Sequence, residues 1–104
     1  MGSYRGRLDI IADILRVASG NAKKTQIMYQ ANLSYKVLTK YITEVSEASL
    51  IDFEYERQCY MLTAKGREFL EAYKEYSRGN RRIEKRLNEI NGKKKILEEL
   101  CSSE

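Results

Sequence analysis

The last third of the chain carries a residue spacing that a single isolated helix cannot bury. Between Phe69 and Cys101 the intervals alternate between four and three residues without a break. This is the heptad repeat of a coiled coil, whose stripe is buried only against another helix. We therefore predict a coiled-coil dimerisation helix over residues 67–104. The stripe, called the seam below, consists of Phe69, Tyr73, Tyr76, Asn80, Ile83, Leu87, Ile90, Lys94, Leu97 and Cys101.

Two glycine pairs interrupt this predicted helix, Gly79-Asn80 and Asn91-Gly92. Each glycine costs about 1 kcal/mol in a helix interior, so a helical hairpin that turns at Gly79 is an alternative. A turn has no reason to preserve the heptad phase, yet the phase runs through both pairs. The continuous helix is therefore favoured, and at about 1.5 Å per residue it spans roughly 48 Å from Phe69 to Cys101.

The direction of the two helices in the coil is left open by the charges. With Phe69 at position d, the e positions include Glu84 and Glu98, and the g positions include Arg86 and Lys93. A parallel coil sets g against e and would pair Lys93 with Glu98. Exposed ion pairs of this kind contribute less than about 1 kcal/mol, so they favour a parallel arrangement only weakly.

The first 66 residues have the pattern of three helices followed by a β-hairpin. Residues 7–18 and 23–30 place apolar side chains at helical spacing, and residues 50–55 and 58–62 alternate in the manner of two short strands. A tight connection separates the second helix from the third. The core-facing residues of the third helix, at i, i+3, i+4 and i+7, are Leu38, Tyr41, Ile42 and Val45.

Several residues have the chemistry that begins or ends these elements. Gly20 is expected in the left-handed position after the first helix, because glycine lacks a Cβ. Ser34 is expected to cap the third helix, and Thr63 the last one. The hairpin tip at Glu56-Arg57 lacks the Asn-Gly or Asp-Gly pair usual in such turns. The predicted fold is mainly α with a small β-hairpin: a winged helix-turn-helix domain over residues 1–66, followed by the long helix.

Two phrases, NLSYKVLTKYI and YMLTAKGREFLEAY, occur in this order on either side of the hairpin. With them the chain resembles the archaeal 10a-type winged-helix chromatin proteins over nearly its whole length. The resemblance implies a homodimer that binds double-stranded DNA and is joined through an antiparallel coil of long C-terminal helices. Such a coil would hold the two winged domains farther apart than one duplex turn, which favours bridging or bending of DNA over two adjacent half-sites.

Net charge is +4, and residues 1–43 hold seven basic but only two acidic side chains. In a helix-turn-helix protein the helix after the turn enters the major groove. Lysine reaches phosphates, threonine and serine contact base edges or phosphates, and tyrosine bonds a phosphate. The start of the second helix also offers free backbone N–H groups to an anion. The predicted DNA-binding residues are Lys23, Lys24, Thr25, Ser34, Tyr35, Lys36, Thr39, Lys40 and, at the hairpin tip, Arg57.

Three further sets of cations have an ordinary structural interpretation beside a DNA-binding one. Arg57 lies between Glu54 and Glu56, which repel phosphate, so its hairpin is as consistent with a purely structural role. Arg5 and Arg7 fit an N-terminal arm, although solvated charges at a helix start explain them more simply. The third set lies on the outer positions of the last helix and comprises Arg78, Arg81, Arg82 and Lys85.

Several function classes are disfavoured. The chain has no histidine, two cysteines and no glycine-rich phosphate loop, so neither an enzyme nor a zinc site is predicted, and no cofactor or small-molecule substrate is expected. No apolar run approaches the roughly 20 residues of a membrane span, and a cytoplasmic, nucleoid-associated protein is expected. The alternative function is a protein-interaction module that uses the winged domain as a scaffold and the coil as its working surface.

Overall fold

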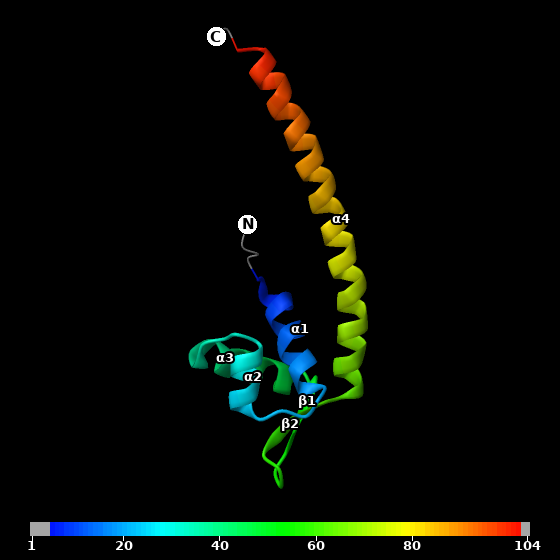
Figure 1. The fold of residues 1–104 in the computed structure, drawn as a ribbon. Helices are drawn as coiled ribbons and strands as arrows, with labels where there is room; N and C mark the ends of the chain where they lie inside the picture. The colour runs from blue at the N-terminus through cyan, green and yellow to red at the C-terminus, as the bar shows by residue number, and fades with distance from the viewer. Residues whose placement is uncertain (1–4, 103–104) are drawn as a thin grey trace. The chain divides into compact units, whose positions relative to one another are not determined.

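The computed structural model describes residues 5–102, and its elements follow the predicted order (Figure 1). They are α1 (Arg7–Ala18), α2 (Lys24–Gln30), α3 (Tyr35–Glu47), β1 (Ile51–Glu54), β2 (Cys59–Leu62) and α4 (Ala64–Leu100). The predicted fold class, a winged helix-turn-helix followed by a long C-terminal helix, is confirmed. By its contacts the chain forms two compact units, residues 1–73 and 74–104. We describe each unit by itself.

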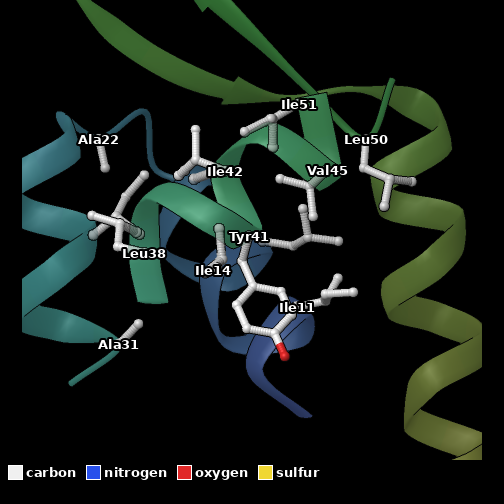
Figure 2. Packing of buried hydrophobic residues seen from close by; sticks show 13 residues of the cluster. Ile11, Ile14, Ala22, Ala31, Leu38, Tyr41, Ile42, Val45, Leu50 and Ile51 are labelled. Atoms are coloured by element: carbon white, nitrogen blue, oxygen red, sulfur yellow. The ribbon is translucent and has the colours of Figure 1, made fainter. Parts of the chain in front are cut away.

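The core of the first unit is built mainly from α1 and α3. Ile14 and Leu15 of α1 and Leu38 and Val45 of α3 are completely removed from solvent. Ile51, at the start of β1, closes the cluster from the hairpin, as Figure 2 shows. The helical spacing of the apolar residues in α3 is confirmed by their burial, because residues at i, i+3, i+4 and i+7 share one helix face.

The helix ends confirm two predictions and overturn one. The Ser34 hydroxyl accepts a hydrogen bond from the Val37 N–H at 3.3 Å, and that of Thr63 accepts one from the Gly66 N–H at 2.9 Å. The expectation for Gly20 is wrong. Asn21, with φ of 56°, takes the left-handed conformation after α1. Asparagine tolerates this region because its short polar side chain bonds locally.

The hairpin confirms the two predicted strands and adds a contact that the sequence did not indicate. β1 and β2 pair antiparallel, with Ile51 opposite Leu62. The turn between them places Gln58 at a φ of 54°, which supplies the positive φ that Asn-Gly would otherwise provide. Ala22, between α1 and α2, forms two backbone hydrogen bonds with Tyr60, of 3.1 and 2.8 Å. The loop before α2 is thereby fixed to β2.

Helix α4 is continuous over 37 residues, so the alternative of a helical hairpin at Gly79 is wrong. Its first turn lies very close to the rest of the winged domain. A Cβ added at Gly66 would lie 2.3 Å from the Leu50 carbonyl oxygen. This is too close for any side chain, so only a glycine fits at this position. Phe69 and Leu70, further along α4, pack against the core of the first unit.

As far as it is described, to residue 102, the second unit consists of the rest of α4 and the two residues that follow it. From residue 74 to residue 102 no side chain is buried. The apolar seam residues Ile83, Leu87, Ile90 and Leu97 are each between 51% and 64% exposed. In the described part of the chain, no helix combines the length and the apolar character needed to cross a membrane.

Candidate nucleic-acid interface

The turn between α2 and α3 brings the first residues of both helices together. The Lys24 ammonium lies 4.7 Å from the centre of the Tyr35 ring and 3.5 Å from its hydroxyl. Lys24 is the first residue of α2 and Tyr35 the first of α3. Because a cation above an aromatic face is attracted by the ring quadrupole, Tyr35 helps to fix the position of the lysine. Tyr35 itself remains 65% exposed.

Four lysines around this contact form a positive surface, called the lysine patch below. Lys23 precedes Lys24 at the N-cap of α2, and Lys36 follows Tyr35 in α3, with Lys40 one turn later. None of the four forms an ion pair with an acidic residue among residues 5–102. Their charge is therefore available to an outside anion.

Three arginines in and just before α1, unlike the four lysines, form ion pairs with carboxylates of the same chain. Arg5 pairs with Asp13 at 2.9 Å and also donates to the backbone carbonyl of Ala31 at 2.6 Å. Arg7 pairs with Glu44 of α3, and Arg16 pairs with Asp13. Arg5 and Arg7 thus connect α1 to the turn after α2 and to α3. Neither is the free N-terminal arm considered from the sequence; residues 1–4 lie outside the described part of the chain.

The predicted hydroxyl donors are placed less uniformly than the lysines. Thr25 is exposed, whereas the Ser34 hydroxyl is occupied as the cap of α3. Thr39 is half-buried, and its Oγ1 is buried without a hydrogen-bond partner among the described residues. Thr39 was predicted to bind DNA, but its hydroxyl does not point outward beside Lys36 and Lys40.

The hairpin tip carries one predicted cation and an exposed aromatic ring that the sequence analysis missed. The Arg57 side chain is 77% exposed, with its Nε 4.0 Å from an oxygen of Glu54. Tyr55 is 80% exposed and packs edge-on against Phe53, with 5.1 Å between the ring centres. The alternation predicted over residues 50–55 stops before Tyr55, because β1 ends at Glu54.

The junction of α1 and α4 holds the carboxylate with the clearest electrostatic perturbation. Hydrogen bonds from the Tyr73 hydroxyl and from the Gly6 N–H lower the pKa of Asp9. The Arg16 guanidinium lies 5.5 Å from the centre of the Tyr73 ring.

Phe69 and Tyr73 were predicted for the dimer seam, yet both contact the winged domain of their own chain. No group of three or more metal-binding side chains occurs among residues 5–102.

The comparisons with known proteins agree with this geometry. A family model described as winged helix-turn-helix matches residues 4–81, three quarters of the chain. The crystal structure of Sso10a-2, a DNA-binding protein from Sulfolobus solfataricus, superposes with a TM-score of 0.65 at 26% identity. That alignment covers 96% of this chain and 100% of Sso10a-2. No functionally curated protein matched. The chain belongs to the winged helix-turn-helix family and, within it, to the proteins of the 10a type.

Proposed function

We propose that the protein binds double-stranded DNA as a homodimer, with α3 in the major groove, and serves chromatin organisation, transcription regulation or both. The observation that carries the proposal is the lysine patch, four cations without acidic partners around the start of the helix that follows the turn. The DNA-binding function of Sso10a-2 supports it. A nucleoid-associated location in the cytoplasm follows from it.

Binding mainly through phosphates is the expected mode. Lysine is a flexible point charge that neutralises a phosphate but discriminates poorly between base edges. The Thr39 hydroxyl is buried, and the Ser34 oxygen accepts the capping bond of α3, so few fixed side-chain groups remain here to read bases. We therefore expect limited sequence preference.

The first test is binding to a random-sequence duplex as a function of salt concentration. Four phosphate contacts predict a log–log slope of about −3.6 for each winged domain, because each neutralised phosphate releases about 0.9 counterion. Lys23→Glu with Lys36→Glu should lower the magnitude of that slope by about 2 and reduce affinity more than tenfold.

The matched control carries the same charge change at the far end of α4, Lys93→Glu with Lys95→Glu. If net charge alone governed binding, both double variants would lose affinity equally, and the assignment to the lysine patch would be wrong. If the wild-type protein bound no duplex even at low salt, DNA binding itself would be rejected.

Self-association through the seam is the second part of the proposal. Burying the half-exposed Ile83, Leu87, Ile90 and Leu97 against a second copy would remove the apolar side chains of the seam from water. Ile83→Asp should convert the dimer to a monomer in sedimentation equilibrium. Ile96→Asp is the matched control: Ile96 is also exposed, at 57%, but lies off the seam. Equal effects of the two substitutions would contradict a seam-specific dimer.

The two helices are proposed to run antiparallel, as the resemblance to the 10a-type proteins implies. In that arrangement the winged domains lie at opposite ends of the coil, which suits bridging of DNA. Cys101 is exposed and lies on the seam near the C-terminus, so oxidation links two copies readily only when the C-termini meet. Rapid formation of a Cys101 disulfide dimer would establish the parallel arrangement instead.

A further inference from the structure

A second strongly basic surface lies on α4, outside the winged domain. Residues 78–86 contain five cations and one acid, Glu84, and all of these side chains are exposed. Four of the five cations are arginines, whereas the lysine patch contains none. The segment comprises Arg78, Arg81, Arg82, Lys85 and Arg86, separated by Gly79, Asn80, Ile83 and Glu84.

Helix geometry places most of these cations opposite the seam. At about 100° per residue, Arg78, Arg81, Arg82 and Lys85 fall within an arc of about 100°. The centre of this arc lies roughly 180° from the seam residues of the same turns. We call these four residues the arginine stripe. A partner helix on the seam leaves the stripe in solvent, whether the coil is parallel or antiparallel.

The charges of the stripe are not neutralised within the chain. None of its members forms an ion pair among residues 5–102, whereas Lys94 pairs with Glu98 further along the same helix at 3.9 Å. Arg78 and Arg82 are four residues apart, as are Arg81 and Lys85, and like charges at this spacing destabilise a helix. A surface needed only for solubility would place acids at these positions, as the end of α4 does. The stripe therefore has the composition of a surface that meets a polyanion.

We propose that the arginine stripe is a second contact surface for the phosphate backbone of double-stranded DNA, in addition to the lysine patch. This inference rests on the proposed function. Arginine presents a planar fork of donors that bonds phosphate oxygens bidentately, which suits backbone contact without base reading. From Arg78 to Lys85 the stripe is about 10 Å long, close to the axial rise of three nucleotides along one strand.

The test compares two double variants of the full-length protein that each remove two positive charges from α4. Arg78→Gln with Arg82→Gln affects the stripe, and Lys93→Gln with Lys95→Gln is the control. We expect the stripe variant to lower the magnitude of the log–log salt slope by up to about 1.8 for each chain, because each chain loses two phosphate contacts. The control should leave the slope nearly unchanged. Glutamine favours helices and removes like-charge repulsion, so helix content and dimer mass should be unaffected in both.

The outcomes separate this proposal from the broader one. If the stripe variant keeps the wild-type slope while Lys23→Glu with Lys36→Glu loses binding, the stripe does not contact DNA, although the lysine patch does. Equal losses in the stripe and control variants would mean that α4 contributes only diffuse charge, and the stripe would be rejected. If the wild-type protein binds no duplex, both proposals are overturned together.

Discussion

The two units of this chain differ in how many of their apolar side chains are buried and how many of their charged side chains are paired within the chain. The winged domain buries its apolar residues in one cluster and pairs Arg5, Arg7 and Arg16 with its own carboxylates. The tail, residues 74–102, buries no side chain, exposes its seam and leaves the arginine stripe without acids. A helix with an apolar stripe on one side and unpaired cations on the other is stable and useful only with partners. The proposed functional surfaces are therefore the places where apolar side chains stay exposed or cations have no acidic partner within the described chain.

Truncation of an isoleucine should test this difference most strongly. Ile14 is completely buried in the winged domain, so Ile14→Ala should cost about 2–5 kcal/mol of unfolding free energy. This cost should not depend on protein concentration. Ile83→Ala, on the seam, should instead show a cost that appears only through dimerisation and therefore varies with concentration. Thermal unfolding at several concentrations measures both. A concentration-independent loss at Ile83 would mean that the tail packs within its own chain.

The same substitution at two glycines of α4 should sharpen the contrast. At Gly66 a new Cβ would meet the Leu50 carbonyl oxygen at 2.3 Å and the Leu62 Cδ1 at 2.5 Å. Backbone has to move to relieve the first contact, so Gly66→Ala should destabilise the winged domain by about 1–3 kcal/mol. Urea unfolding followed by circular dichroism measures the loss. Wild-type stability of this variant would show that the first turn of α4 can shift without cost.

At Gly79 the same substitution should raise the stability instead of lowering it. A Cβ there meets no atom within 4 Å, and the residue lies in the interior of a continuous helix. Gly79→Ala should therefore stabilise the helix by about 0.5–1 kcal/mol, because alanine restricts the unfolded chain and favours helical dihedrals. Helix content and melting temperature should both rise. A loss of stability would indicate that a partner helix approaches Gly79 too closely for a methyl group.

The sequence predicted what depends on local periodicity and missed what depends on distant contacts. The burial of Leu38 and Val45 and the caps at Ser34 and Thr63 follow from patterns within a few residues, and all were confirmed. The hydrogen bonds between Ala22 and Tyr60 join residues far apart in the chain, so no local pattern announces them.

The candidate site shows the same division. The lysines of α2 and α3 were found because a charge count needs no structure. That count also included Arg5 and Arg7, whose acidic partners lie up to 37 positions away. The heptad pattern included Phe69 and Tyr73, although Phe69 packs against the core of the winged domain and the Tyr73 hydroxyl donates a hydrogen bond to Asp9. Periodicity shows that a residue shares a helix face, but only the fold decides which neighbour covers that face.

The smallest expected effect lies within the first unit, at the contact between α1 and the start of α4. The Tyr73 hydroxyl and the Gly6 N–H both donate to Asp9 and lower its pKa below the usual value of about 3.9. Because the pKa is lower in the folded chain than in the unfolded one, the ionised carboxylate stabilises the fold above about pH 4. That contribution is lost as the pH falls through the folded pKa.

Tyr73→Phe removes the larger of the two hydrogen-bonding causes while keeping the ring beneath Arg16. The variant should be slightly less stable than wild type at pH 7. The difference should shrink as the pH falls from about 4 through the lowered pKa of Asp9, below which the carboxyl is protonated in the wild type too. Urea unfolding at pH 7, 4 and 3 measures this difference. Asp9→Asn is the companion variant, since it removes the titrating group itself and should weaken the effect of Tyr73→Phe when the two are combined. Additive losses in the double variant would show that the Tyr73 hydroxyl stabilises the fold through a group other than the Asp9 carboxylate, which would contradict this account of the junction.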